Sequence, residues 1–238
     1  MDVKRGNRST STPEAERLTP DEIVNTYQVK SDTRTEYLPS PEILSGIFLN
    51  KESMTQTESD LLKTLQFQKG AVGLSEFEDT VKEARSVSHD YYKPDDNEAI
   101  GLVHPKGGED GHQDAFRHAY WNALMTQRFG EDFAKSFATA HEGVPNNPAT
   151  REAMDLHNNE VGRQIALAHP DATDEELAKL VGEAVKNGKM VVIDRNDDLV
   201  YSDKESVGMT GTAVLSVPRE DVTTEVPEYA YPAAPSPD

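Results

Sequence analysis

Apolar residues recur every three to four positions through the middle of the chain, the spacing of one face of an α-helix. Glycine or proline follows each of these segments and stops it, because glycine adopts a left-handed conformation easily and proline lacks an N–H. The pattern therefore predicts four main helices, over 113–129, 131–142, 149–168 and 173–187.

The N-terminal third shows shorter helical patterns. Thr19 precedes Pro20 and two acidic residues, which is typical of a helix start with threonine as N-cap and proline in the first turn. A second helix is predicted over 58–68. A third begins near Ser75, where Ser75 and Glu78 have the spacing of a capping box.

Two short apolar runs near the C-terminal side, 190–194 and 199–203, read as the strands of a β-hairpin. Acidic and amide side chains at 194, 196 and 198 also approximate a calcium-binding loop. Leu199 stands where that loop needs glycine, so a hairpin turn is favoured. The predicted fold is mainly α: a helical bundle-like domain with one small β-hairpin.

Four regions are expected along the chain. Residues 1–18 are rich in Ser, Thr and charge and are predicted to be disordered. Residues 19–94 form an N-terminal helical extension, and residues 95–206 form a helical domain that includes the hairpin. The region 207–238 carries five prolines and is expected to be a Pro-rich acidic tail that contributes little to the core from 215 onwards.

Charge and composition narrow the classes of partner. Lys and Arg number 24 against 43 Asp and Glu, a net charge of −19, so an interaction with nucleic acid or an anionic bilayer is disfavoured. The chain has no cysteine, which excludes disulfides and thiolate metal sites. No transmembrane segment and no cleavable signal peptide are recognised. We expect a soluble protein, either cytoplasmic or secreted by a dedicated secretion apparatus.

A polar stripe on the helix predicted over 113–129 is the main candidate for chemistry. Asp114, His118 and Asn122 recur every four residues and share a side with Trp121 and Met125, so they are expected to point inward. An unpaired polar group buried in this way costs roughly 2–7 kcal/mol. Such residues either satisfy one another or take part in chemistry.

The helix predicted over 149–168 carries a matching stripe of Asp155, Asn158, Asn159 and Gly162. Glycine within a helix costs about 1 kcal/mol relative to alanine, so a neighbouring helix or ligand is expected to come close to Gly162. Short connections predict that neighbouring helices are antiparallel and that their polar stripes meet.

Five residues are candidates for catalysis. His118 is assigned as a general base or metal ligand, oriented by Asp155 or Asp114. His141 and Glu142 end the preceding helix and are expected near the same place. We expect His118 and Asp155 to lie on adjacent antiparallel helices, with a distance between them of about 3–6 Å.

Five further residues are candidates for substrate binding, with Arg117 stabilising an anionic group. The sequence leaves open whether a divalent metal ion is a cofactor, although the chain lacks the His-Glu-x-x-His zinc motif. Gly107, Gly108 and Gly111 could hold an ion at the helix N-terminus. The substrate-binding candidates are Arg117, Asn122, Asn158, Asn159 and Arg163.

Three blocks carry a resemblance to known proteins: DAFRHAYWN at 114–122, AHE at 140–142 and MDLHNNEVGR at 154–163. Together they resemble an uncharacterised bacterial domain family whose members are often secreted or toxin-like. A weaker resemblance is to secreted phospholipases A2, which implies a catalytic His118 oriented by Asp155. Ala119 stands where that family has its calcium-binding Asp.

The sequence thus favours a bacterial effector or toxin-type hydrolase that acts on a lipid ester or phosphoester, such as a phospholipid or other cell-envelope substrate. A cognate inhibitor protein would be a partner of such a toxin. Two alternatives stay open: a non-catalytic toxin or binding module whose polar helices form a scaffold, and a lysozyme-like cell-wall glycosidase built around Glu142.

Overall fold

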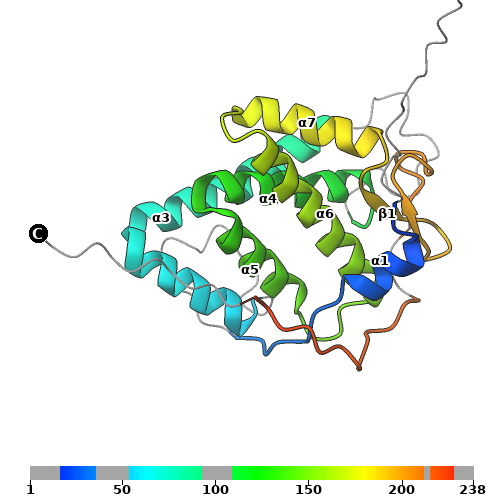
Figure 1. The fold of residues 1–238 in the computed structure, drawn as a ribbon, viewed down its shortest axis with the longest axis horizontal. Coiled ribbons are helices and arrows are strands. Elements are labelled where there is room, and N and C mark those ends of the chain that lie inside the picture. Colours follow the sequence, from blue (N-terminus) through cyan, green and yellow to red (C-terminus); the bar gives the residue numbers. More distant parts are fainter. Residues whose placement is uncertain (1–16, 36–53, 93–108, 212–214, 228–238) are drawn as a thin grey trace, which may run out of the picture.

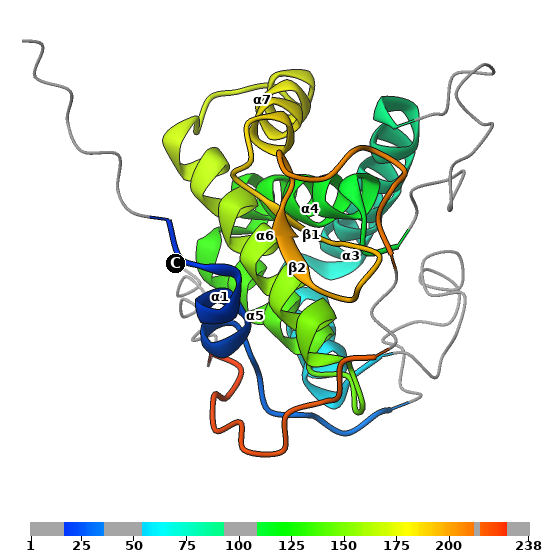
Figure 2. The same ribbon diagram turned by 90° about the vertical axis from the view of Figure 1, so that its right-hand side faces the viewer.

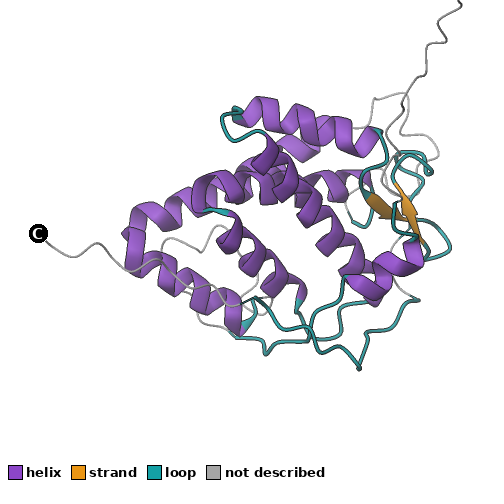
Figure 3. Ribbon diagram, in the orientation of Figure 1, coloured by secondary structure: helices purple, strands orange, loops and turns teal. Residues whose placement is uncertain are grey.

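The computed structural model describes residues 17–35, 54–92, 109–211 and 215–227. Within these residues the chain forms six α-helices and one two-stranded antiparallel sheet (Figure 3). The predicted fold class, mainly α with one small hairpin, is therefore confirmed. None of the described helices combines the length and apolar character that crossing a membrane requires.

Three consecutive helices form the centre of the molecule: α4 (His112–Phe129), α5 (Glu131–Glu142) and α6 (Ala149–Ala168) (Figure 1). Their bounds agree closely with prediction, because Gly130, Gly143 and Pro170 end or follow them. Residue Gly130 alone separates α4 from α5 and has a positive φ of 88°, which reverses the chain at little cost.

The relative direction of α4 and α6 differs from the prediction of antiparallel packing. Polar contacts join His118 to Asp155 near the start of both helices and Asn122 to Asn159 one turn later. Contacts that advance together along both helices mean that α4 and α6 run in the same general direction. The physical reason is that α5 follows α4 and precedes α6 in the chain and runs back in the opposite direction.

The helix α3 (Gln56–Tyr91) consists of two helical segments that meet at a kink, close to the two helices predicted over 58–68 and from Ser75. It bends at Gly70, whose φ of 63° and ψ of −156° are not helical. The helix N-cap is Thr55, which forms a capping box with Glu58. The predicted capping box at Ser75 is wrong, because Ser75 lies within the continuing helix.

Helix α7 (Asp174–Lys186), the strands β1 (Val191–Ile193) and β2 (Leu199–Tyr201), and the short helix α1 (Pro20–Thr26) complete the described elements. The strands pair with Val192 opposite Val200. Figure 2 shows this hairpin against α6, with α1 on the same side of the molecule. The Thr19 cap of α1 has the predicted geometry.

Two apolar clusters hold these elements together. One contains Phe116 and Tyr120 of α4 with residues of α6, α7 and the hairpin. The other joins α3 to α4 and α5 through Phe77, Phe133 and Phe137. Helix α3 contributes fully buried side chains such as Phe77 to this second cluster and so packs closely against α4 and α5.

The segment 215–227 lies on the body of the protein, whereas the sequence predicted a tail that contributes little (Figure 1). The backbone N–H of Lys30 donates to the carbonyl of Thr224, and the N–H of Ala149 donates to that of Val217. Val226 packs against the cluster around Phe77. Of the predicted disordered N-terminus, all but residues 17 and 18 lie outside the described residues, as do 228–238.

Candidate active site

A polar cavity of about 320 Å³ lies where the starts of α4 and α6 meet the end of α5. All five predicted catalytic residues line it, as does Arg117. Those five come from three helices and from positions up to 41 residues apart in the sequence, so the fold brings the three sequence blocks together. The catalytic candidates at the cavity are Asp114, His118, His141, Glu142 and Asp155.

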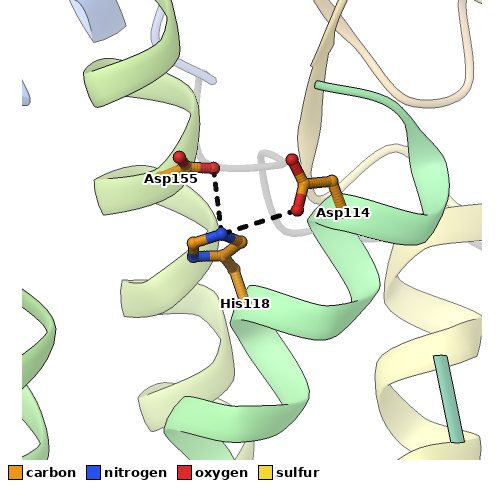
Figure 4. Close-up of side chains that lie close together, drawn as sticks. All are labelled: Asp114, His118 and Asp155. Atoms are coloured by element: carbon orange, nitrogen blue, oxygen red, sulfur yellow. Dashed lines mark ion pairs between the residues drawn. The ribbon is translucent and has the colours of Figure 1, made fainter. Parts of the chain in front are cut away.

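His118 is the centre of the group and is surrounded by carboxyl groups (Figure 4). Its Nε2 lies 3.5 Å from Oδ1 of Asp114 and 3.6 Å from Oδ1 of Asp155. Its Nδ1 lies 3.7 Å from Oε1 of Glu142. The predicted separation of His118 and Asp155, about 3–6 Å, is confirmed.

Arg117 provides the positive charge at this centre. Its Nη2 donates to Oδ1 of Asp114 and lies 3.2 Å from Nε2 of His118. The other carboxylate oxygen of Asp114 accepts a hydrogen bond of 2.7 Å from the backbone N–H of Asp110. Asp114 is therefore held by two donors, which makes it the best satisfied of the three carboxyl groups.

Several buried atoms at the centre have no hydrogen-bond partner within the described part of the chain: Nδ1 of His118, Oε1 of Glu142 and Oδ1 of Asp155. All three residues are buried, His118 being 5% exposed. Buried polar atoms in native proteins are nearly always paired, so a group of unpaired ones beside a cavity points to a role other than stability.

The protonation of these groups follows from burial. Burial lowers the pKa of His118 to about 3, against the opposing effect of Asp114, so the imidazole is neutral and weakly basic. Burial raises the pKa of Glu142 to about 7 and holds that of Asp155 well above its ordinary value. Burial raises the pKa of Asp114, but the charge of Arg117 and the hydrogen bonds from Arg117 and the backbone of Asp110 act against it, and this pKa lies below its ordinary value.

The sequence did not identify Glu58, which pairs with His141. Nδ1 of His141 lies 2.7 Å from Oε1 of Glu58, and the carboxylate is fully buried at the start of α3. Burial lowers the pKa of His141, but Glu58 and then Glu142 outweigh it and raise the pKa to about 9. The capping box of Thr55 with Glu58 is visible in the sequence, but its link to a histidine 83 residues away is not.

A second missed pair borders the cavity. Arg151 on α6 donates two hydrogen bonds, of 2.8 and 2.7 Å, to the buried carboxylate of Asp110 just before α4. This bidentate pair fixes the start of α4 against α6. Of the predicted glycine-rich loop, Gly107 and Gly108 lie outside the described residues, and Gly111 is the N-cap of α4.

Three predicted substrate-binding residues lie one turn beyond the cavity and bond to one another. Nδ2 of Asn122 donates to Oδ1 of Asn159 at 2.6 Å, and Nη1 of Arg163 donates to Oδ1 of Asn122 at 3.0 Å. None of the three is among the cavity-lining residues. The structure therefore places Asn122, Asn159 and Arg163 in a polar network between α4 and α6, away from the expected substrate position.

The fourth, Asn158, holds the hairpin. Its Nδ2 donates to the carbonyl of Val191 at 2.9 Å, and its Oδ1 accepts from the N–H of Val191 at 3.0 Å. His112 and His157 also contact backbone carbonyls next to the hairpin, those of Ser202 and Lys189. These contacts give Asn158 and both histidines a structural task, and Asn158 is not at the cavity.

Gly162 explains how the two polar stripes come so close. A Cβ atom at this position would lie 2.0 Å from the backbone oxygen of Ala119, so only glycine fits at this crossing. The close approach inferred from the sequence is confirmed, and the neighbour is helix α4 rather than a ligand.

Comparison with known proteins adds one finding. Residues 73–189 match the model of a family described as a domain of unknown function (DUF6973). The match includes Asp114, His118, Glu142 and Asp155, whereas Glu58 precedes it. This agrees with the expectation of an uncharacterised domain family, and the matched range contains all three blocks that carried the resemblance. No curated protein and no solved structure matches the chain.

Proposed function

We propose that this protein is a hydrolase that cleaves a small anionic ester, best matched by a phosphoester, in the cavity at His118. The observation that supports this most is the group of unpaired buried atoms on His118, Glu142 and Asp155, which border a cavity large enough for a small ligand. A structural network of the same residues would instead pair them.

The lining of the cavity favours a polar substrate. The apolar side chains among its lining residues are those of Val144, Pro145 and Pro148, and the rest are charged or polar. A fatty acyl chain needs a continuous apolar groove, so within the described residues the phosphoester is favoured over the lipid ester predicted from the resemblance to phospholipases A2. A phospholipid could still present its phosphate-bearing head group.

The positions suggest a role for each residue. Glu142 accepts a proton from a water molecule, whose oxygen then bonds to phosphorus while the bond to the leaving group breaks. The same carboxyl group returns the proton to the leaving oxygen. Arg117 stabilises the negative charge on the phosphoryl oxygens. His118, a weak base because it is buried, would orient Glu142 rather than act as the base itself.

The test is hydrolysis of bis(p-nitrophenyl) phosphate beside p-nitrophenyl acetate, with divalent cations supplied. We expect turnover of the phosphoester and a loss of at least about 100-fold in kcat for Glu142→Gln. Glu160→Gln is the matched control, because Glu160 lies on α6 and bonds to Tyr27 instead of lining the cavity. Absence of turnover by the wild type, or full activity of Glu142→Gln, would contradict the proposal.

The sequence-based hypothesis of a secreted bacterial toxin belongs to the same proposal. A hydrolytic toxin should inhibit the growth of bacteria that express it, and His118→Ala should remove the inhibition without lowering expression. Equal growth inhibition by the wild type and His118→Ala would mean that toxicity does not depend on this site, and it would favour a non-catalytic binding module.

A further inference from the structure

Three donor atoms at the centre of the cavity converge on one point. Asp114, His118 and Asp155 each offer one donor atom, these atoms all lie within 4.8 Å of one another, and the three side chains are buried (Figure 4). The two distances from Nε2 are 3.5 and 3.6 Å. Both are too long for hydrogen bonds but suit atoms that share a cation.

These distances fit a tetrahedral metal ion. Zinc binds imidazole nitrogen and carboxylate oxygen at about 2.0–2.2 Å, so neighbouring donors in a tetrahedral site are about 3.4 Å apart. Magnesium and calcium prefer six or more oxygen ligands, and an imidazole is unusual in their sites. The three donors would leave a fourth position open, and all three residues line the cavity.

The surroundings of the imidazole ring agree with a ligand role. An Arg guanidinium carries only donors, so its approach to Nε2 of His118 at 3.2 Å means that Nε2 presents its lone pair. The proton of the neutral ring is then on Nδ1, which faces Oε1 of Glu142 at 3.7 Å. A histidine that binds metal typically directs its other N–H toward a carboxylate in this way.

Arg117 already supplies a cation at this point. Its Nη2 contacts both Asp114 and His118, which are two of the three donors. Its side chain lines the cavity and is 36% exposed, so it can move away from Asp114 and His118 when another cation arrives. Oδ1 of Asp155, 4% exposed as a residue and without a hydrogen-bond partner among the described residues, has no such compensation.

We propose that Asp114, His118 and Asp155 bind a divalent transition-metal ion, best matched by Zn²⁺, in exchange for the guanidinium of Arg117. Glu142, which faces Nδ1 of His118, would hold the imidazole ring so that Nε2 points at the metal. Once the metal has displaced it, the guanidinium of Arg117 would face the fourth coordination position, where an anionic ligand of the metal would lie.

The site goes beyond the proposed hydrolysis, and its test requires no turnover. The full chain is dialysed against EDTA and then against ZnCl₂, and bound zinc and the melting temperature are measured. We expect one Zn²⁺ per chain and a rise in Tm, because an ion that binds only the folded state stabilises it. His118→Gln and Asp155→Asn should each weaken binding by more than about 10-fold.

Arg117→Ala is the most specific variant. Because the metal no longer displaces a guanidinium, zinc should bind at least as tightly as in the wild type, and we expect a several-fold gain. His157→Gln and Asp198→Asn are matched controls on α6 and the hairpin turn that should keep one zinc per chain. Circular dichroism confirms that each variant is folded.

Zinc binding that is unchanged in His118→Gln and Asp155→Asn, or absent from the wild type, would overturn the proposal. So would a clear loss of affinity in Arg117→Ala. Zinc binding without phosphoester turnover would support this inference and contradict the proposed function. Turnover in EDTA by a protein that binds no zinc would support the proposed function and contradict this inference.

Discussion

The polar stripe shared by α4 and α6 has two halves with opposite characters. In the first, His118 faces Asp155 and Glu142 at distances of 3.6 and 3.7 Å, and each of these residues keeps an unpaired atom. In the second, Asn122 bonds to both Asn159 and Arg163. The halves lie about one helical turn apart and contain residues of similar polarity.

The difference shows what separates a scaffold from a candidate site. The second half pairs its donors with acceptors and lies away from the cavity; its exception is Nδ2 of Asn159, an amide close to His118. The first half borders the cavity and leaves its atoms unpaired. Polarity at helical spacing predicted both halves equally, so hydrogen bonding and the cavity, rather than residue type, distinguish them.

The largest expected effect comes from the crossing between the halves. Gly162→Ala places a methyl group against the backbone of Ala119, which cannot move without separating α4 from α6. We expect a loss of at least about 3 kcal/mol in the free energy of unfolding, measured with urea.

Gly182→Ala on α7 is the control for that substitution. Its methyl group would meet the side chain of Tyr91, which is 48% exposed and can move aside. Alanine also favours a helix over glycine, so stability should stay unchanged or rise by up to about 1 kcal/mol. Equal losses in the two variants would show that the close contact at Gly162 is not what holds the halves together.

A smaller loss of stability is expected from a substitution in the second half of the stripe, where Asn122 bonds to Asn159 and Arg163. Asn122→Ala leaves Arg163 and Asn159 without a buried partner, and we expect a loss of about 1–3 kcal/mol in the free energy of unfolding. Hydrolysis and zinc binding should persist below the melting temperature. A variant of normal stability that lacks activity would place Asn122 in the site and remove the distinction between the halves.

A smaller effect concerns the pair of His141 with Glu58. The pKa of folded His141, about 9, lies above its ordinary 6.5, so the proton stabilises the folded state below pH 6.5 and this stabilisation is lost as the pH rises through 9. Glu58→Gln keeps a side chain that can cap α3 but removes the charge.

The wild type should therefore lose about 1 kcal/mol more than Glu58→Gln between pH 6.5 and 9, a small difference because His141 is partly exposed. Urea unfolding at both pH values measures it. Parallel decreases in the two proteins would mean that Glu58 does not hold the proton on His141.

Local signals were sufficient for most of the fold. Gly130, Gly143 and the Thr19 cap act within a few residues of their own position, and the helices they delimit have nearly the predicted bounds. Gly70, two residues after the helix predicted over 58–68, is where α3 leaves helical geometry, and packing of Leu74 and Phe77 in the core stabilises the helical segment that follows it.

The site could be predicted only in part. His118 and Asp155 lie on inward stripes, which periodicity reveals, and both reach the cavity. Glu58 and the pair of Asp110 with Arg151 depend on contacts across 41 to 83 residues that no local pattern encodes. Asn158 shares the stripe of Asp155, but its partner is the backbone of Val191, which only the folded hairpin places there.

The most direct test of the proposed hydrolase is the pair of stability and activity measurements on His118→Ala. We expect a change in Tm of less than about 3 °C, because His118 forms few hydrogen bonds that its neighbours would lose, together with a loss of phosphoester hydrolysis of at least about 100-fold. A variant that melts much lower yet keeps full activity while folded would show that His118 belongs to a scaffold, as Asn122 does, and would contradict the proposed hydrolase.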